Sequence, residues 1–354
     1  MKIALLDGAY KNAGDFLIRD RATALIRKCI PEADLLCLKR NQIEKEIDAI
    51  NDCEAIIFIG GPLVMQNVED FVPLNVCVNK ITKPMMLLGV GWYGNSGTES
   101  AINHYNFHES TFVFLNKISS CGFGIGCRDL YTYKVLKRAG ITNVMVTGCP
   151  AWFDLDYIDS INLNGRDDSV HMIGVSDPAL PQNDHLAHLL LLYLKDKYPE
   201  AQIKFIMHRD GRSNNIIGNI KDIEVIDISG KADGFSIYDN FDLHIGFRVH
   251  AHIYNLSHRK KSILIEEDGR GAGVNEILGL LPLKAYDERF RSQNKLIEKV
   301  FRNTSLQHNK HAIEDIDLVI DSYEKTSYQY LLNAFMLQKS YYELMVAFIR
   351  RVLK

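Results

Sequence analysis

The stretch DLHIGFRVHAHIYN, residues 242–255, decides the fold because it joins a strand pattern directly to a helix pattern. Residues 243–247 form a short apolar run with β-branched and aromatic members, and residues 248–256 carry apolar side chains at helical spacing. Gly246 stands at the junction, where the lack of a side chain lets the backbone bend sharply or approach a ligand closely. The sequence therefore predicts a strand that enters a helix through a tight turn.

Arg248 and His250 stand in the first turn of this predicted helix. The free amide hydrogens of a first helical turn, with the positive end of the helix dipole, attract anions. A fixed guanidinium beside an imidazole that exchanges protons near neutral pH suits an anionic substrate whose reaction needs proton transfer. A structural interpretation is also open from the spacing alone, with Arg248 in an ion pair and His250 as a hydrogen-bonded interior histidine.

The bulk properties of the chain limit its class. Its 354 residues exceed what one hydrophobic core usually serves, so two domains are expected. The formal net charge of −3 gives no basic field, which argues against nucleic acid as a partner. Seven scattered cysteines without a CxxC pair predict reduced core thiols and no disulfide frame or zinc site. No apolar stretch has the length of a signal peptide or a membrane span, so a cytoplasmic protein is expected.

Strand, glycine loop and helix recur along the first half of the chain. Strands are predicted at residues 2–6, 54–59, 84–88, 122–127 and 144–146. Glycine-containing segments, such as DGAYKNAGD, GGP, GVG and TGC, follow their carboxyl ends, which is typical of a doubly wound parallel sheet with a ligand crevice along that edge. None of these loops is a GxGxxG or P-loop motif, so neither a dinucleotide site nor a Walker-type NTP site is supported. Taken singly, a glycine loop of this kind more often forms a simple turn than a ligand-binding loop.

The first helix is predicted at residues 16–29, with Asp15 as its N-cap. Residues 154–168 are polar and rich in turn formers, as expected of an interdomain linker. The alternation then restarts, with strands predicted at 171–176, 202–207, 223–228, 243–247 and 262–265, and helices at 183–198 and 275–280. The fold class expected is α/β, with two Rossmann-like domains facing each other across a cleft, as in GT-B glycosyltransferases.

The alternation stops near residue 291, and residues 291–354 form a predicted helical tail. Helical patterns cover residues 313–325 and 328–353. The last segment, SYYELMVAFIRRVLK, is apolar on one side and basic at its end. This pattern is compatible with peripheral association at a membrane surface, but packing on the first domain or on a partner in a homo-oligomer is the commoner fate of such a segment.

A series of short motifs in fixed order resembles the polysaccharide pyruvyl transferases. The motifs are Asn12-Ala-Gly14-Asp15, Gly60-Gly61-Pro62, Arg128-Asp129, Gly148-Cys149-Pro150, Arg248-Val-His250, Glu267-Asp268-Gly-Arg270-Gly and Asn275-Glu-Ile-Leu-Gly279-Leu. They span residues 1–285, and it is their joint order, more than any one of them, that is specific for the family. Val249 stands where other members often have leucine, and no motif fixes the acceptor sugar.

The resemblance implies transfer of pyruvate from phosphoenolpyruvate to a sugar of a surface polysaccharide or its precursor. The product would be a cyclic ketal, with phosphate released, and the scaffold GT-B-like. The family's Arg-x-His motif corresponds to Arg248 and His250, and its Arg-Asp motif to Arg128. We expect His250 to act as general acid and base, and Arg248 with the helix N-terminus to grip phosphate or carboxylate. Arg128 would reach in from the first domain.

The resemblance implies that the domain of residues 1–160 binds the acceptor and that the domain of residues 169–290 binds the donor. Further substrate-binding candidates are Asn12, Asp15, Gly60, Gly61, His208, Arg209 and Glu267. His208, Arg209 and Glu267 are equally compatible with solvated loop positions. Phosphoenolpyruvate is the expected donor, the acceptor glycan is compatible with a lipid-linked form, and the scheme requires no metal and no obligatory cofactor.

Two other functions stay open at this point. A GT-B glycosyltransferase would hold the diphosphate of a nucleotide-sugar donor with Arg248 and the same helix dipole. A scaffold subunit of a glycan-assembly complex would keep the fold without the chemistry. Release of phosphate from phosphoenolpyruvate separates the first function from the glycosyltransferase. Intact glycan modification in vivo by His250→Ala or Arg248→Ala would support the scaffold.

Overall fold

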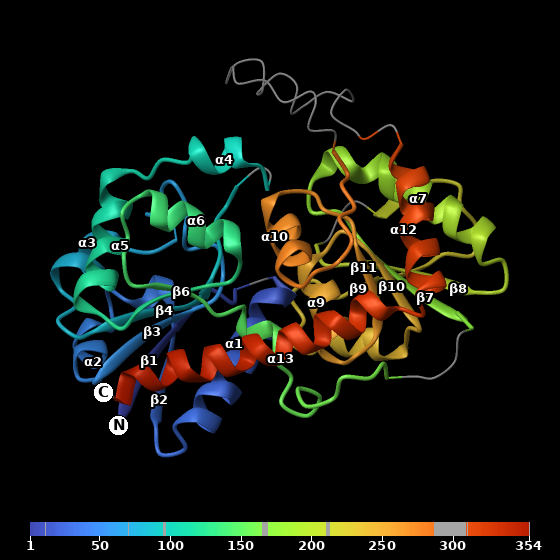
Figure 1. Cartoon of the computed structure of the whole chain (residues 1–354). Coiled ribbons are helices and arrows are strands. Elements are labelled where there is room, and N and C mark those ends of the chain that lie inside the picture. The colour runs from blue at the N-terminus through green and yellow to red at the C-terminus, as the bar shows by residue number, and fades with distance from the viewer. Residues whose placement is uncertain are drawn as a thin grey trace. The chain divides into compact units, whose positions relative to one another are not determined.

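The computed structural model describes the chain except residues 11, 70, 95–96, 165–168, 210–212, 287–308, 310 and 354. The chain divides into two compact units. Unit 1 comprises Met1–Asp159 and Met336–Lys354, and unit 2 comprises Ser160–Phe335. Each unit is built on one parallel sheet with helices packed against it (Figure 1). The expected fold class, two Rossmann-like α/β units with helices at the C-terminal end of the chain, is confirmed.

Unit 1 contains a six-stranded parallel sheet in the order β2-β1-β3-β4-β5-β6. Its strands are β1 (Lys2–Asp7), β2 (Asp34–Lys39), β3 (Ala55–Ile59), β4 (Met85–Val90), β5 (Gly124–Cys127) and β6 (Val144–Val146). The chain moves outward in one direction from β1 and in the other from β3, so the sheet has a topological switch point between these two strands. Strand β2 was not expected from the sequence.

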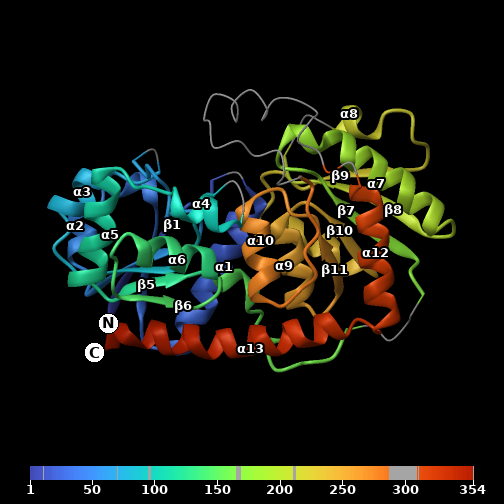
Figure 2. The same ribbon diagram turned by 45° about the horizontal axis from the view of Figure 1, so that its top comes forward.

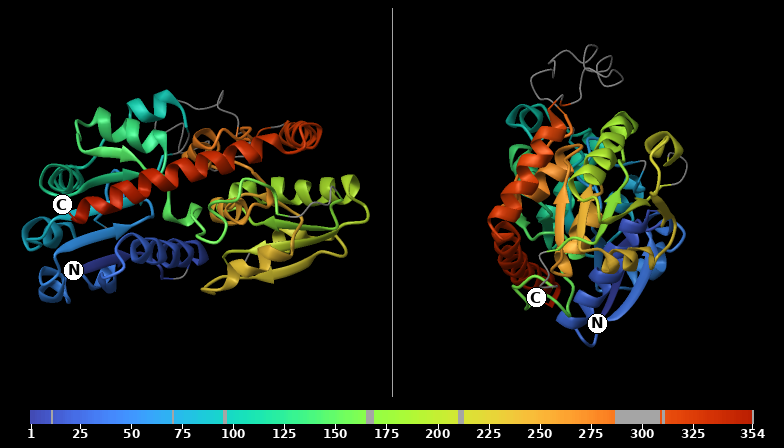
Figure 3. Two further views of the ribbon diagram at one scale, coloured as in Figure 1. Left: turned by 60° about the horizontal axis from the view of Figure 1, so that its bottom comes forward. Right: turned by 90° about the vertical axis from the view of Figure 1, so that its right-hand side faces the viewer.

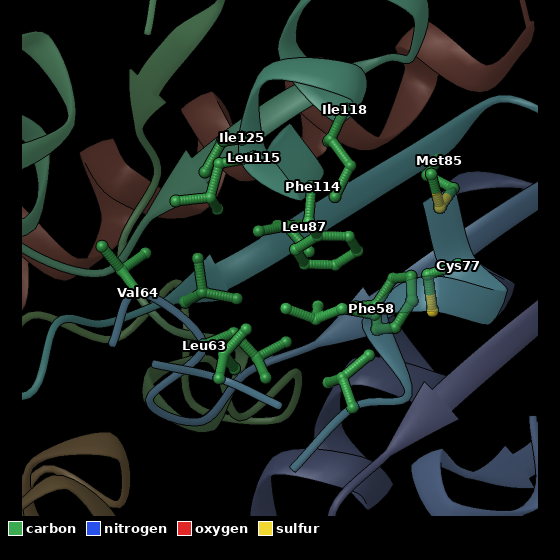
Figure 4. Close-up of a cluster of buried hydrophobic side chains, with 14 of the residues drawn as sticks. Phe58, Leu63, Val64, Cys77, Met85, Leu87, Phe114, Leu115, Ile118 and Ile125 are labelled. Carbon is green, nitrogen blue, oxygen red and sulfur yellow. The ribbon is translucent and has the colours of Figure 1, made fainter. Parts of the chain in front are cut away.

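The helices of unit 1 are α1 (Ala13–Cys29), α2 (Ile47–Asn51), α3 (Leu74–Asn79), α4 (Glu99–Asn103), α5 (Glu109–Cys121) and α6 (Leu130–Arg138). Figure 4 shows the core between the sheet and α5, where side chains of β3, β4 and β5 gather against the helix. Phe58 of β3 and Phe114 of α5 meet edge to face at 5.7 Å between ring centroids, and both are fully buried. Apolar residues at both faces of each strand explain why the sheet is covered on both sides.

The first helix begins earlier than the sequence suggested. Asn12 is its N-cap, because the Asn12 side-chain oxygen accepts a hydrogen bond of 3.1 Å from the amide of Gly14. The prediction of Asp15 as N-cap is wrong, since Asp15 lies inside the first turn. A carboxylate there complements the positive end of the helix dipole. The seven cysteines are free thiols, five buried and two, Cys37 and Cys121, exposed.

Unit 2 contains a five-stranded parallel sheet in the order β11-β10-β7-β8-β9. Its strands are β7 (Met172–Ser176), β8 (Gln202–Met207), β9 (Glu224–Asp227), β10 (Leu243–Gly246) and β11 (Lys261–Leu264). The order reverses between β7 and β10, which gives this unit a switch point of its own. The junction of β10 with the following helix therefore lies at the position where open α/β sheets bind ligands.

The helices of unit 2 include α7 (Asp184–Lys197), α8 (Ser213–Ile217), α9 (Val249–Ser257), α10 (Gly269–Ile277) and α12 (Ala312–Lys325). Helix α12 lies beside α7 (Figure 2), where Asp317 accepts hydrogen bonds from Tyr193 at 2.6 Å and Lys197 at 2.7 Å. The helix expected at 275–280 is displaced, because α10 already begins at Gly269. Asp268 caps it by accepting a hydrogen bond of 2.8 Å from the Arg270 amide.

The long helix α13 (Gln329–Ile349) connects to unit 1 through its second half (Figure 3). Met345, Phe348 and Ile349 are fully buried, and Tyr341 meets the Trp152 ring at 6.0 Å. The apolar side of this segment is therefore occupied by protein contacts. Among the residues that the structure describes, no helix combines the length and the hydropathy that a membrane crossing requires.

Packing of α13 predicts a specific loss of stability. Replacing Phe348 by alanine should lower the free energy of unfolding by about 3–5 kcal/mol, because it removes a fully buried ring that lies against Gly126. Leu344→Ala on the same helix is the control, since Leu344 is exposed and should change the free energy by about 0.5 kcal/mol or less. Chemical denaturation measures both, and equal effects would contradict the packing.

Candidate active site

The switch point of unit 2 depends on a close approach between the ends of β7 and β10. A Cβ atom at Gly246 would lie 2.5 Å from the Ser176 Oγ and 2.6 Å from the Ser176 carbonyl oxygen, so only glycine fits. Two residues later, Arg248 is the N-cap of α9, and its amide donates a hydrogen bond of 3.1 Å to Ser176 Oγ. The turn thus fixes the backbone of Arg248 at the carboxyl edge of the sheet.

The side chain of Arg248 is held by a carboxylate at the end of β7. Nε donates to Asp177 Oδ1 at 2.7 Å and Nη2 donates to Asp177 Oδ2 at 2.5 Å, and Asp177 is fully buried. Two parallel charge-assisted bonds fix the guanidinium plane. Among the described residues Nη1 has no hydrogen-bond partner, so one edge of the fork stays open for an anion. The ion pair expected under the structural interpretation exists, and it orients the cation.

His250 lies in the first turn of α9 and is half-buried. It is close enough to His208 that its charge, together with the larger effects of burial and of Arg248, lowers the pKa of His208 well below its ordinary value. The first turn of α9 therefore brings together the cation and the imidazole that the sequence singled out. Amide hydrogens of such a turn have no intrahelical acceptor, which adds to the attraction for an anion.

His208 and Arg209 follow β8 and have different environments. His208 is 3% exposed, its amide donates to Asp177 Oδ1 at 3.0 Å, and its Nε2 lies 2.7 Å from the Tyr238 hydroxyl on the 3-10 helix η4 (Gly234–Asn240). Burial keeps this imidazole neutral. Arg209 is exposed. The structure thus makes His208 an interior support of Asp177 and leaves Arg209 at the surface.

Glu267 lies after β11 and organises the loop that follows Asp177. Its carboxylate accepts hydrogen bonds from the amides of Ala179 at 2.8 Å and Leu180 at 3.0 Å and from Asn183 Nδ2 at 2.7 Å. Burial raises the Glu267 pKa to about 7, against the opposing effect of these bonds. Glu267 is thus a buried carboxylate that titrates near neutral pH beside the candidate site.

Two supporting residues were missed at the sequence level. His244 is fully buried on β10, with Nδ1 2.8 Å from Ser262 Oγ and Nε2 3.0 Å from Ser176 Oγ, the atom that also accepts from the Arg248 amide. Burial lowers the pKa of His244 well below its ordinary value. Asp177 is the other missed residue. Its position directly after a predicted strand was the signal that could have identified it.

Unit 1 presents its own polar groups at the carboxyl edge of its sheet. Arg128 follows β5, is 8% exposed, and donates from Nε to Asp129 Oδ2 at 3.1 Å. Its Nη2 is buried without a hydrogen-bond partner among the described residues and lies against Gly91, where a Cβ atom would be 2.3 Å from it. Asp129 also caps α6 by accepting from Thr132, so its carboxylate is shared. Arg128 keeps an unused donor at this edge.

The remaining candidates of unit 1 gather at the switch point between β1 and β3. Asn12 and Asp15 lie at the start of α1, which follows β1, and Gly60 and Gly61 follow β3. Both glycines have positive φ, and a Cβ atom at Gly60 would lie 2.4 Å from Ile18 Cγ2 of α1. Their local role is thus a close approach of the β3 turn to α1. Among the described residues no group of three or more His, Cys, Asp or Glu side chains is placed to hold a metal ion.

Glu267 provides a test by pH. Its folded pKa lies above the ordinary carboxyl value, so the folded protein binds more protons than the unfolded chain between about pH 4.5 and 7. Stability contributed by the protonated form is therefore lost as pH rises through this window, by about 3 kcal/mol in total. Urea unfolding of wild type and Glu267→Gln should show this pH-dependent difference. The exposed Glu276→Gln is the control, and parallel profiles for wild type and Glu267→Gln would refute the assignment.

Comparison with known proteins gives a family and a fold. The family model described as polysaccharide pyruvyl transferase matches residues 12–269, which include both the Arg128-Asp129 and the Arg248-Val-His250 motifs. No curated protein has a significantly similar sequence.

Three solved structures are similar over almost the whole chain. S. aureus MnaA with UDP has 10% sequence identity and a TM-score of 0.55, and the match covers 92% of this chain and 97% of that chain. UDP-GlcNAc 2-epimerase from Neisseria meningitidis bound to UDP-GlcNAc has 10% identity and a TM-score of 0.53, with 92% of this chain and 100% of that chain covered. A glycosyltransferase from Rickettsia africae has 12% identity and a TM-score of 0.56, with 100% of this chain and 98% of that chain covered. At these identities the likeness shows the fold alone, and it supports the GT-B-like class.

Proposed function

The chain belongs to the polysaccharide pyruvyl transferase family, and on that premise we propose that it transfers pyruvate from phosphoenolpyruvate to a sugar as a cyclic ketal and releases phosphate. The observation that carries the proposal is the Arg248–Asp177 ion pair at the N-terminus of α9, with His250 in the same helical turn. Phosphoenolpyruvate carries a carboxylate and a phosphate, so its binding needs fixed positive groups. The open edge of Arg248 and the helix N-terminus supply them in unit 2.

The proposed reaction begins with proton donation from His250 to the methylene carbon of phosphoenolpyruvate. The positive charge that develops on the neighbouring carbon is attacked by one sugar hydroxyl, whose proton passes back to His250. The bond between that carbon and the phosphate oxygen then breaks, and phosphate leaves with its negative charge held by Arg248. A second hydroxyl of the same sugar adds to the carbon and closes the ring, and its proton passes to the released phosphate. Each proton transfer is of the kind an imidazole performs near neutral pH.

We assign the donor to unit 2 and the acceptor glycan to unit 1. The assignment is supported by the separate switch points, each with polar groups at its carboxyl edge. In unit 1, the unused Nη2 donor of Arg128 is suited to an acceptor oxygen, because an unpaired buried donor costs free energy until a ligand satisfies it. Asp177, His208, Ser176 and His244 serve as positioning residues for Arg248.

A nucleotide-sugar glycosyltransferase is the second candidate function. It is favoured by the fold likeness to proteins whose structures contain UDP or UDP-GlcNAc. In that case the open edge of Arg248 and the start of α9 would hold a diphosphate. Incubation with phosphoenolpyruvate and assorted galactosides or hexosamine glycosides distinguishes the two. Phosphate release supports pyruvyl transfer, whereas no release combined with thermal protection by UDP, and not by phosphoenolpyruvate, supports the alternative.

Substitutions in unit 2 should separate binding from proton transfer. His250→Ala should lower kcat for phosphate release by about 10²–10⁴-fold with little change in KM for phosphoenolpyruvate, because it removes the general acid and base. Arg248→Lys should instead raise the KM for phosphoenolpyruvate, since lysine lacks the planar fork. The control is His185→Ala on α7, an exposed histidine of the same unit. Full activity of His250→Ala would contradict the mechanism.

Substitution in unit 1 should affect the acceptor. Arg128→Lys should raise the KM for the acceptor about tenfold and leave the KM for phosphoenolpyruvate unchanged, because the lost Nη2 contact is assigned to the acceptor. Arg138→Lys on α6 is a matched control, because the carbonyls of Ile102 and Tyr105 are the only acceptors of Arg138 among the described residues. Steady-state kinetics with each substrate varied in turn measures both constants. A changed KM for phosphoenolpyruvate alone would reverse the assignment of the units.

A further inference from the structure

Unit 1 contains a buried arginine that neither the motifs nor the mechanism above uses. Arg40 directly follows β2, at the start of the 3-10 helix η1 (Arg40–Gln42), and is 5% exposed. Its Nη2 donates to the carbonyl oxygens of Ile59 at 2.8 Å and Gly60 at 2.7 Å. The guanidinium therefore lies beneath the turn that follows β3, at the switch point of the sheet.

The charge of Arg40 is not neutralised by a neighbouring carboxylate. The Asp7 carboxylate is paired with Lys39 at 2.7 Å and also accepts from the Ala9 amide. No described carboxylate lies within ion-pair distance of Arg40, although Asp15 and Asp7 are near enough to act on it through space. Burial outweighs them and lowers the Arg40 pKa to about 10. A buried cation without a counter-ion is costly, so an anion that binds beside Arg40 would offset this cost.

Two nitrogen atoms of Arg40 have unused donors. Nε is buried and has no hydrogen-bond partner, and Nη1 has none among the described residues. Nη1 lies against two glycines, because Cβ atoms at Gly8 and Gly61 would be 3.0 Å and 3.3 Å from it. Because both positions are glycine, no Cβ atom of either residue covers Nη1. The first turn of α1, capped by Asn12, follows in the same loop.

The residues near Arg40 offer a further cation and an exposed aromatic ring. Lys39, which is paired with Asp7, lines a cavity of about 570 Å³ together with Arg19, Arg27 and Asp20, and Arg40 is not part of that lining. Tyr10 is 48% exposed, and its hydroxyl accepts a hydrogen bond of 3.0 Å from the amide of Asn41, the residue after Arg40. A ring held in this way provides a surface on which a sugar can pack.

We propose that Arg40 is the base of a second anion site, in unit 1, which binds the phosphoryl group of a phosphorylated acceptor sugar. A guanidinium with unused donors, glycines that permit close approach and a helix N-terminus match the tetrahedral oxygens of a phosphoryl ester. The identification of the ligand as an acceptor rests on the proposed function, whereas the anion site itself does not. The shared chemistry is a sugar phosphate or diphosphate, whether joined to a nucleoside or to a lipid.

The binding test uses inorganic pyrophosphate with the full chain and saturating phosphoenolpyruvate, so that the site in unit 2 is already occupied. Pyrophosphate should raise the melting temperature of the wild type further. Arg40→Lys, which keeps the charge and a donor for the carbonyls, should weaken pyrophosphate binding at least about tenfold. Arg138→Lys should behave as wild type, because Arg138 lies on α6, away from this site in the sequence, and donates to the carbonyls of Ile102 and Tyr105. Equal protection of Arg40→Lys and wild type would overturn the proposal.

A second variant keeps the test decisive if Arg40→Lys does not fold. Gly8→Ala places a methyl group 3.0 Å from Nη1 and leaves Arg40 in place. It should also weaken pyrophosphate binding at least about tenfold, because it closes the approach to the guanidinium. Unchanged binding by folded Gly8→Ala would overturn the proposal in the same way.

The acceptor test compares sugars with and without phosphate in the pyruvyl transfer assay. Arg40→Lys should raise the KM of a nucleoside-diphosphate sugar or a polyprenyl-diphosphate sugar at least about tenfold, and that of the dephosphorylated sugar little. The acceptor whose KM rises more shows whether the phosphoryl group that binds Arg40 is joined to a nucleoside or to a lipid. Equal KM values in all arms would refute the inference while pyruvyl transfer stands. Pyrophosphate binding that depends on Arg40, without any transfer, would retain the anion site and reject the proposed function.

Discussion

The ion pair between Arg248 and Asp177 is the constraint on which the chemistry of unit 2 depends. Asp177 is fully buried at the end of β7, and a buried carboxylate requires a partner. The sharp turn at Gly246 sets the end of β10 against Ser176 and places Arg248 within reach of Asp177. The pair then fixes a cation at the N-terminus of α9. Buried neutral histidines, His208 and His244, complete the support without adding competing charge.

The two units use the same topological position in contrasting ways. In unit 2 the arginine at the switch point has a built-in counter-ion and keeps one open edge. In unit 1, Arg40 donates to two carbonyls, and its charge has no carboxylate within ion-pair distance among the described residues. A carboxylate partner fixes the orientation of an arginine before a ligand binds. Without such a partner, the cost of burying the guanidinium charge can be offset by an anionic ligand. The contrast underlies the two proposals, a role of Arg248 in the reaction and a role of Arg40 in binding an anionic group.

The sequence predicted most of the alternating strands and helices, because apolar runs and glycine turns are local signals. Strands β6 and β8 begin and end where they were expected. Strand β2 was missed because it is a half-exposed edge strand without clean alternation, and with it the position of Arg40 was lost. The start of α10 was missed because GRGAG has low helix propensity, which burial and the Asp268 cap override. Arg248 and His250 were identifiable from their junction. Asp177 pairs with Arg248 across 71 positions of sequence, so only the tertiary fold shows their contact.

The most direct measurement of the central claim is a crystal structure of the full chain with phosphoenolpyruvate. The account predicts that the phosphate or the carboxylate lies about 3 Å from Nη1 of Arg248, at the first turn of α9, with the Arg248–Asp177 pair intact. His250 should then face the methylene carbon. Phosphoenolpyruvate bound elsewhere, or Arg248 without contact to either anionic group, would contradict the account.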